Sequence, residues 1–541
     1  TDSTVNRGKI LAKNAIFKRA ASDAQTLTLD NTDGVIRVQK VLTLQQGCVK
    51  NRHGKCFAKS LRGNTTGDLN NQSGRIQVEE RARLNIRGTL QNSHGAIIQS
   101  VEQSRSFNPL AVSEADGIFL KTPNNIHCTD GGEISAYQGT VEIKPVTSSS
   151  RLDDDTQKIK VDDTSRVCGA AATKITGFKQ VRFLTPLISN AVEINSDAVQ
   201  LRRGVYAKNS AKLTQPHGKL RVEDIWRGGD YSVHAEQFDN NNGTLDLQNL
   251  TAYADDIALL GNTTVEKELT LYPRRSRKLA ESTGDAAHRL RAGRINFHLA
   301  EGETITEPYT TLGSLSYRLS AMATQPLVFL ANQTSLHGDF SVEAPVPVKM
   351  GDATHFVTLT TEQGNVSVKA RTFDIEQGGI VSLNNFIEAP GGFTLGRLVE
   401  DPTRQVFATV YAHAQSGGSS NLGEHVFRSY QFLGNTITTN QFYHHGHLFV
   451  LPMATTNGSF LQIRDSSKIL GSFQHWGALK THNLTIHSPE PSVWEASKTQ
   501  VAGNCTLTGK FSLKRTTSIL TAGYYMCQRT VFQDNIKHSF C

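Results

Sequence analysis

LDNTDGVIRV at residues 29–38 returns three times in this chain, as VKNRHGKCFA at 49–58, LNNQSGRIQV at 69–78 and LQNSHGAIIQ at 90–99. Each copy has an apolar residue, an asparagine two positions later, a glycine three positions further on, and a second apolar residue two positions beyond the glycine. The copies begin 20, 20 and 21 residues apart (49−29, 69−49, 90−69). A fixed period of this size is typical of stacked supersecondary units, so the sequence predicts a solenoid.

The repeat positions can be followed through the four copies and into a fifth, FDNNNGTLDL, which begins at residue 238. Val49 and Phe238 depart from leucine at the first position, and Cys56 and Leu245 depart from isoleucine at the fourth. The repeat residues are Leu29, Asn31, Gly34 and Ile36; Val49, Asn51, Gly54 and Cys56; Leu69, Asn71, Gly74 and Ile76; Leu90, Asn92, Gly95 and Ile97; and Phe238, Asn240, Gly243 and Leu245.

Short strands joined at corners explain the spacing within one copy. Residues i and i+2 of a strand lie on the same face, so Leu29, Ile36 and Val38 are expected to point inward. Gly34 marks a corner that needs either a positive φ or a close backbone approach. Each unit of about 20 residues then supplies two or three short strands, and it buries its apolar residues only by stacking on its neighbours.

Stacking predicts which residues meet. Leu29, Val49, Leu69 and Leu90 form one column, and Ile36, Cys56, Ile76 and Ile97 form another, so Cys56 is expected to be a small buried hydrophobe. The four asparagines form a third column, in which each side-chain amide both donates and accepts a hydrogen bond. We therefore expect an all-β, right-handed parallel β-helix with about 20 residues per rung, that is, per turn of the solenoid.

The pattern weakens along the chain and suggests four regions. Residues 1–28 are a candidate amino-terminal cap, 29–100 hold the regular repeats, 101–400 form an irregular β-helix, and 401–541 form a divergent carboxy-terminal β region. Two polar, charged stretches near 145–166 and 273–294 are expected to be loop excursions, the second with a short helix near Ala280 or Ala286.

Composition restricts the function classes. The chain has 541 residues and a formal net charge of +8, which indicates either general solubility or affinity for anionic glycans, lipids or nucleic acid. No nucleic-acid-binding motif accompanies the charge, so no such partner is predicted. The sequence has no run of about 18 apolar residues, so it predicts no membrane-spanning helix. The chain lacks an initiator Met and a leader, which suggests a processed form or an excised fragment.

Three groups of residues are candidates for a site or a cross-link, and no cofactor is predicted. A polyanion-binding cluster is one interpretation of the basic stretch, and a plain basic loop is the other; its members are Arg274, Arg275, Arg277, Lys278, Arg289, Arg291 and Arg294. His445 and His447 share a strand face that suits a divalent metal, although turn histidines are common on surfaces. Cys505 and Cys527 lie about one rung apart, a spacing that allows a disulfide between neighbouring coils.

The template Leu-x-Asn-x-x-Gly-x-Ile-x-Val, repeated about every 20 residues, resembles the haemagglutinin repeats of filamentous haemagglutinin-like, two-partner-secreted exoproteins. That family includes adhesins and contact-dependent inhibition proteins. The resemblance implies a bacterial secreted or outer-surface protein whose β-helical stem binds a cell-surface receptor or glycan, or presents a terminal module. It also implies an outer-membrane transporter of the two-partner type as a partner.

Three function classes remain open from the sequence. The first is the non-catalytic stem that binds surfaces, with end-to-end self-association if its end rungs are uncapped. The second is a carbohydrate-active β-helix enzyme, a polysaccharide lyase or hydrolase. The third is a toxin or effector whose activity lies in residues 401–541. No Gly-x-Ser-x-Gly elbow is present to indicate a serine nucleophile.

Overall fold

A computed structural model describes the chain almost continuously up to residue 376 and mainly through its strands beyond that point. All regular secondary structure in this part is β-strand. The described residues are 4–18, 28–45, 47–99, 116–145, 157–280, 290–376, 378–382, 384–389, 393–395, 410–414, 429–432, 436–445, 447–450, 460–470, 473–475, 478–494, 497–514, 518–521, 525–528 and 539–540.

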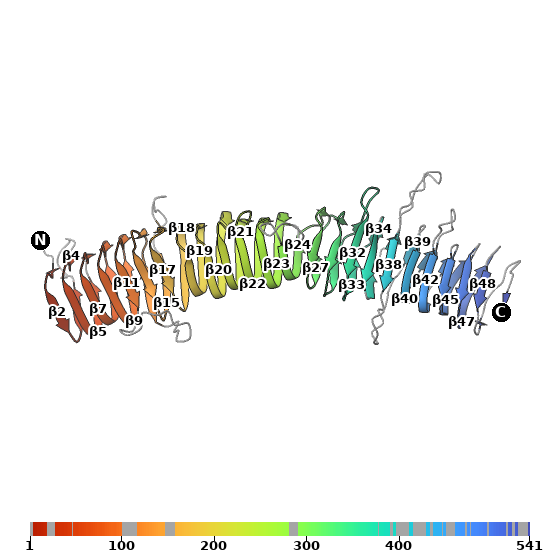
Figure 1. Cartoon of the computed structure of the whole chain (residues 1–541), viewed down its shortest axis with the longest axis horizontal. Helices are drawn as coiled ribbons and strands as arrows, with labels where there is room; N and C mark the ends of the chain where they lie inside the picture. Colours follow the sequence, from red (N-terminus) through yellow and green to blue (C-terminus); the bar gives the residue numbers. More distant parts are fainter. Residues whose placement is uncertain are drawn as a thin grey trace. The chain divides into compact units, whose positions relative to one another are not determined.

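The chain forms two compact units. Unit 1 comprises residues 1–267, 275–280 and 284–290, and unit 2 comprises 268–274, 281–283 and 291–541. This division does not follow the boundaries near 100 and 400 that the sequence predicts. Within each unit, strands of successive rungs pair in parallel and lie side by side (Figure 1). The predicted all-β parallel solenoid is therefore confirmed.

Unit 1 begins with short strands at corners and continues with strands nearly a full rung long. Its strands are β1 (Thr4–Val5), β2 (Lys9–Ala12), β3 (Ala15–Lys18), β4 (Thr28–Asp30), β5 (Val35–Gln45), β6 (Cys48–Lys50), β7 (Lys55–Thr65), β8 (Leu69–Asn70), β9 (Arg75–Ile86), β10 (Leu90–Gln91), β11 (Ala96–Gln99), β12 (Gly117–Lys121), β13 (Ile126–Cys128), β14 (Glu133–Ala136), β15 (Thr140–Lys144), β16 (Lys158–Val161), β17 (Arg166–Gly169), β18 (Ala172–Phe183), β19 (Leu187–Leu201), β20 (Val205–Arg221), β21 (Ile225–Asp239), β22 (Thr244–Leu259) and β23 (Asn262–Leu279), the last with residues in both units.

The predicted register of the four repeats is confirmed residue by residue. Leu29 pairs with Val49, Val49 with Leu69, and Leu69 with Leu90. The second column, from Ile36 through Cys56 and Ile76 to Ile97, pairs in the same way. All eight side chains are at most 7% exposed, and Cys56 is indeed a buried small hydrophobe.

The asparagine column is a continuous ladder of side-chain hydrogen bonds. Asn31 Nδ2 donates to Asn51 Oδ1 at 2.7 Å, Asn51 to Asn71 at 2.8 Å, and Asn71 to Asn92 at 2.8 Å. The sequence analysis missed one member, Asn6, whose Nδ2 donates to Asn31 Oδ1 at 2.7 Å. Each amide is thus satisfied inside a closed core by the amide of the next rung.

The ladder ends where cysteine replaces asparagine. Asn92 Nδ2 lies 3.7 Å from Cys128 Sγ and donates to the carbonyl oxygen of Glu133 at 2.9 Å. The fifth copy of the repeat is likewise buried, with Phe238, Asn240 and Leu245 at most 1% exposed. Asn240 Nδ2 donates to Thr263 Oγ1 at 3.0 Å rather than to another asparagine.

Close approach, and not a positive φ, explains the corner glycines. The left-handed conformation falls one residue earlier, on Asp33 at 58° and His53 at 54°. A Cβ at Gly54 would overlap the backbone oxygen of Asn31, and a Cβ at Gly74 would overlap that of Asn51. Glycine is needed at this position because the preceding rung occupies the space of a side chain.

Parts of three stretches expected to be a cap or loop excursions belong to the solenoid, and the predicted helix near Ala286 lies outside the described residues. Residues 4–18, the described part of the expected cap at 1–28, form a rung in which Ile10 pairs with Ile36 and Phe17 with Leu44. In the stretch 145–166, residues 158–161 are strand β16, and 146–156 lie outside the described residues. The basic stretch from 274 to 279 belongs to β23 and is neither loop nor helix. The strand has charged side chains on its outward positions, so its amino-acid composition is like that of a loop.

Unit 2 continues the same parallel pairing with an aromatic core. Tyr317, Phe329, Phe340 and Phe373 are all at most 1% exposed. Its strands are β24 (Leu290–Leu299), β25 (Thr304–Ile305), β26 (Tyr309–Thr311), β27 (Leu315–Leu319), β28 (Leu327–Phe329), β29 (Gln333–Ser335), β30 (Phe340–Ala344), β31 (Val348–Met350), β32 (Val357–Thr361), β33 (Asn365–Ala370), β34 (Phe373–Ile375), β35 (Gly378–Ser382), β36 (Asn384–Glu388), β37 (Phe393–Leu395), β38 (Val410–Ala414), β39 (Ser429–Phe432), β40 (Thr436–His445), β41 (His447–Val450), β42 (Phe460–Leu470), β43 (Phe473–His475), β44 (Ala478–Thr481), β45 (Asn483–Trp494), β46 (Lys498–Val501), β47 (Cys505–Leu513), β48 (Ser518–Thr521), β49 (Tyr525–Gln528) and β50 (Ser539–Phe540).

Removing one amide from the middle of the ladder is expected to destabilise unit 1. Asn51→Ala leaves the Asn31 amide without its acceptor and the Asn71 amide oxygen without its donor. Each buried group left unpaired costs about 1–3 kcal/mol, so the midpoint of urea unfolding should fall clearly. The exposed Asn64, which accepts from Asn85 Nδ2 at 3.3 Å, is the control, and Asn64→Ala should change stability by less than about 0.5 kcal/mol. Equal effects of the two substitutions would contradict the ladder's role.

The corner glycines allow a sharper comparison, because Gly8 holds the same place in the first rung as Gly54 holds in an inner rung. Nothing lies within 4 Å of a Cβ built at Gly8. Gly54→Ala must displace backbone and should cost about 1–3 kcal/mol in the free energy of unfolding, whereas Gly8→Ala should be neutral or slightly stabilising. Urea unfolding of the two variants tests this, and a costly Gly8→Ala would count against close approach as the reason for glycine.

Candidate functional site

The outward positions of four neighbouring strands in unit 1 gather positive charge. Arg62 on β7 pairs with Arg83 on β9, Arg83 with Phe119 on β12, and Phe119 with Glu142 on β15. Asn64, Asn85, Lys121 and Lys144 form the next outward column by the same pairings, since residues i and i+2 share a face. We call this surface the basic face; it consists of Arg62, Asn64, Arg81, Arg83, Asn85, Phe119, Lys121, Glu142 and Lys144.

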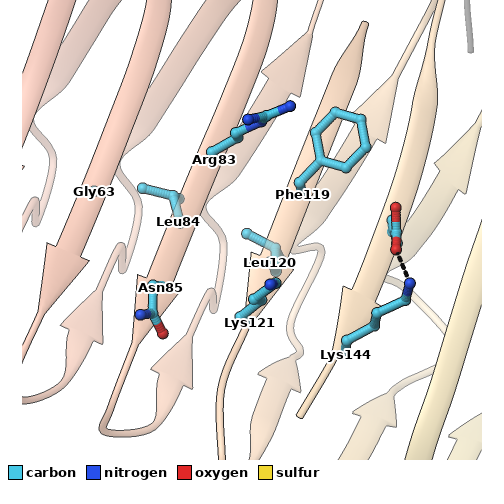
Figure 2. A pocket seen from close by; sticks show the side chains of 9 residues that line it. Gly63, Arg83, Leu84, Asn85, Phe119, Leu120, Lys121 and Lys144 are labelled. Atoms are coloured by element: carbon cyan, nitrogen blue, oxygen red, sulfur yellow. Dashed lines mark ion pairs between the residues drawn. The ribbon is translucent and has the colours of Figure 1, made fainter. Parts of the chain in front are cut away.

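The basic face is hollowed around Phe119. A cavity of about 490 Å³ lies there, and Figure 2 shows Arg83 and Phe119 side by side from neighbouring strands, with Lys121 and Asn85 beyond them. Gly63 contributes to the floor: a Cβ built there would lie 2.5 Å from Leu84 Cδ2, so the Leu84 side chain fills the space that a larger residue would take. The cavity volume is in the range of small-molecule and glycan-sized sites.

The cations of the basic face differ in their partners. Lys144 forms an ion pair with Glu142, which Figure 2 marks, and Arg81 Nη2 lies 3.9 Å from Asp116 Oδ1. Among the described residues, no carboxylate lies within ion-pair distance of Arg62, Arg83 or Lys121. Within the part of the chain that the structure describes, three positive charges of the basic face therefore have no neutralising carboxylate.

Two guanidinium groups of the neighbouring strand β9 lie close to the ring of Phe119. The Arg81 Cζ lies 5.7 Å from the centroid of its half-buried ring, and the Arg83 Cζ lies 5.8 Å from it. Both distances are within the range of cation–π attraction, which orients the arginines over the ring. Their planar forks suit the paired oxygens of a carboxylate, sulfate or phosphate, and the aromatic ring offers an apolar contact next to them. This arrangement can bind an anionic ligand that also has an apolar face.

The predicted polyanion cluster is not one exposed group. Arg275 Nη2 lies 3.2 Å from Asp255, 3.3 Å from Asp256 and 3.8 Å from Glu236, so three carboxylates surround its charge. Arg277 is only 9% exposed. The remaining cations are exposed on strands β23 and β24, except for Arg289, which lies outside the described residues; they are Arg274, Lys278, Arg291 and Arg294.

The predicted metal site stays a prediction. His445 is the last residue of β40 and His447 the first of β41, and their side chains lie outside the described residues. Within the described residues, no group of three or more His, Cys, Asp or Glu side chains is arranged to hold a metal ion.

The backbone register does not favour the predicted disulfide. Cys505 pairs with Tyr525, whereas Cys527 pairs with Leu507, so the two cysteines are offset by two residues on neighbouring strands. With strands about 4.8 Å apart and a rise of about 3.3 Å per residue, their Cα atoms are roughly 8 Å apart. Disulfides seldom form beyond about 7 Å, so the spacing of one rung is not sufficient for the bond.

The sequence analysis missed the basic face for a definite reason. Arg62 and Arg83 are one regular rung apart, but the next member, Phe119, follows 36 residues later (119−83), because residues 100–115 separate β11 from β12. The available signal was the excess of outward arginine in the second strand of the regular repeats, at Arg62, Arg81 and Arg83. The partners of these arginines become visible only when the rungs are placed in register.

Comparison with known protein families, curated proteins and solved structures finds no match for this chain. Function is therefore inferred from the geometry of the chain's own residues. No helix among the described residues is long and apolar enough to cross a membrane.

Two cysteines of the core are expected to be chemically inert in the folded protein. Burial raises the pKa of both Cys56 and Cys128 to about 12, so at pH 8 both are thiols and not thiolates. Treatment of the native chain with a thiol reagent at pH 8, followed by peptide mass spectrometry, should leave both unmodified, and treatment in urea should modify both. Rapid native modification of either residue would contradict their place in the core.

Proposed function

We propose that the chain is a non-catalytic β-solenoid stem of a secreted or surface-exposed bacterial protein, and that its basic face binds an acidic polysaccharide on a host or neighbouring cell. The observation that carries the proposal is a set of three cations, Arg62, Arg83 and Lys121, that have no carboxylate partner among the described residues. Arg83 and Lys121 line the hollow around the half-buried Phe119, and Arg62 is next to Arg83 in the same outward column. The resemblance of the repeats to those of two-partner-secreted exoproteins supports the bacterial and extracellular setting, and with it an outer-membrane transporter as a partner.

A solenoid surface suits a linear polymer. Neighbouring rungs are about 4.8 Å apart, so each outward column places one side chain beside each successive unit of an extended chain. The strands carrying Arg62, Arg83 and Phe119 are held by parallel pairing on both sides, and the side chains below them are buried. Little ordering is required on binding, which preserves affinity.

The chemistry of the basic face favours a glycan over a simple inorganic anion. Arginine forks bind carboxylate or sulfate groups, and the Phe119 ring beside Arg81 and Arg83 can contact the apolar face of a sugar ring. Because the cations are exposed, their attraction is screened by salt. Binding should therefore weaken strongly as the ionic strength rises.

Neutralising Arg83 is expected to weaken binding of heparin and polygalacturonate by roughly tenfold, since hydrogen bonds to charged groups contribute about 1.5–3 kcal/mol. Arg83→Gln should also lower the salt dependence of the affinity. Arg227→Gln is the matched control, because Arg227 is an exposed strand arginine whose Nε is paired with Asp246 at 2.8 Å. The affinities of the native chain and both variants can be measured by surface plasmon resonance at low and high salt. Equal losses in both variants would show non-specific attraction and contradict a site at the basic face.

The same polymers distinguish binding from catalysis. The native chain is incubated with heparin and with polygalacturonate, and polymer length is followed by size-exclusion chromatography. Unchanged length together with Arg83-dependent binding is the expected result. Shortening of either polymer would overturn the non-catalytic proposal in favour of a carbohydrate-active enzyme.

A further inference from the structure

Unit 2 has a second concave surface whose chemistry differs from that of the basic face. A cavity of about 460 Å³ lies over strands β24, β27, β30 and β33, again within the range of ligand sites. Two outward columns line it. The floor column pairs Asn296 with Ser316, then Ser341 and Ser367, and the wall column pairs His298 with Arg318, then Glu343 and Lys369. We call this surface the polar trough.

The floor of the polar trough is pre-oriented at one end. Ser316 Oγ donates to Asn296 Oδ1 at 2.7 Å, and Asn296 Nδ2 donates to Glu268 Oε1 and to Thr270 Oγ1. These bonds fix the orientation of the Asn296 amide, with Oδ1 toward Ser316 and Nδ2 toward Glu268 and Thr270. They also leave the Ser316 oxygen able to accept a hydrogen bond.

The rest of the floor offers unused hydroxyl groups. Among the described residues, neither the Ser341 hydroxyl nor the Ser367 hydroxyl has a hydrogen-bond partner, and both side chains are half-buried. A hydroxyl group can donate and accept a hydrogen bond, so each of these serines can bind a ligand hydroxyl either as donor or as acceptor. Their spacing of one rung, about 4.8 Å, is close to the length of one sugar unit in an extended oligosaccharide.

Two neighbouring residues of the wall, Arg318 and Glu343, are paired in charge, and Lys369 at the end of the wall also interacts with the protein. Arg318 Nε lies 2.8 Å and Nη2 lies 2.6 Å from Glu343 Oε2, so the two charges compensate each other. The other guanidinium N–H groups and Glu343 Oε1 still provide donors and an acceptor along one edge. Because the two charges compensate each other, the pair attracts a charged ligand only weakly, whereas its remaining donors and acceptor can bind hydroxyl groups.

His298 adds a flat and uncharged wall. Its ring stacks on Tyr272 with centroids 4.4 Å apart and an angle of 11° between the planes. Burial, together with the nearby Arg318, lowers the pKa of His298, so the imidazole is neutral at pH 7. A neutral imidazole has one donor and one acceptor nitrogen, like the other groups of the polar trough.

From this geometry we infer that the polar trough binds a neutral, hydroxyl-rich oligosaccharide that lies along the Ser316–Ser341–Ser367 column. The proposal goes beyond the anionic ligand of the basic face, because it assigns a second site in the other unit and a ligand class without charge. The groups named above can donate and accept hydrogen bonds, which is the pattern that sugar hydroxyls require.

Filling the middle of the polar trough tests the proposal. Native protein is titrated calorimetrically with maltohexaose, cellohexaose and mannohexaose, and at least one should bind. Ser341→Leu places a branched side chain at the centre of the floor and should weaken that binding by roughly tenfold or more. Ser232→Leu is the matched control, since Ser232 is a half-buried outward strand serine of unit 1, and it should leave binding unchanged. Thermal unfolding of both variants checks that they remain folded.

Salt and charge separate this site from the basic face. Binding of the neutral hexasaccharide should be nearly constant between low and high salt and unchanged by Arg83→Gln, whereas heparin binding should change with both. The inference is overturned if none of the three hexasaccharides binds, or if Ser341→Leu and Ser232→Leu have the same effect. It is also overturned if Ser341→Leu reduces salt-sensitive heparin binding instead, because the ligand of the trough would then be anionic. The two results with neutral hexasaccharides do not depend on whether the basic face binds its proposed ligand, so failure of one proposal can be told from failure of the other.

Discussion

The hydrogen bond from one asparagine amide to the next is the constraint on which the regular part of unit 1 depends. A corner inside a closed coil buries polar groups that water cannot reach, and each amide is satisfied only when the next rung places its own amide directly above it. That requirement aligns Leu29 with Val49 and Ile36 with Cys56. It also brings the rungs so close at the corner that only glycine fits beside the backbone of the rung before it.

The same alignment organises the surface. Once interior columns are in register, the outward residues between them also form columns, and the chemistry of a face is the sum of residues that are far apart in the sequence. On the basic face this gathers cations that have no carboxylate partner among the described residues, and in the polar trough it produces a row of hydroxyls beside the Arg318–Glu343 pair. Two binding surfaces of different chemistry can thus arise from one backbone pattern.

The sequence alone was sufficient for the fold and for the register of four rungs, because the asparagine and glycine positions are set by close backbone contacts that few residues tolerate. It missed the rung at residues 4–18, where Asn6 and Gly8 are separated by one residue and not by two. It also misjudged residues 274–279, since arginine on the outward positions of a strand gives the same composition as a loop. The basic face could not be predicted from the sequence, because its columns cross the interruption between Gln99 and Gly117. No local pattern shows which residue lies opposite Arg83.

In-register stacking also restricts how the length of such a chain can change over evolution. Removing residues 49–68 would take out one complete turn and leave Leu69 to meet Leu29, and Asn71 to meet Asn31, with the same contacts as before. Loss of a single residue within a strand would instead turn the inner side chains of the rest of that strand outward. Growth and shrinkage by whole turns is therefore tolerated where single-residue insertion is not, and the chain can gain or lose binding surface in units of one rung.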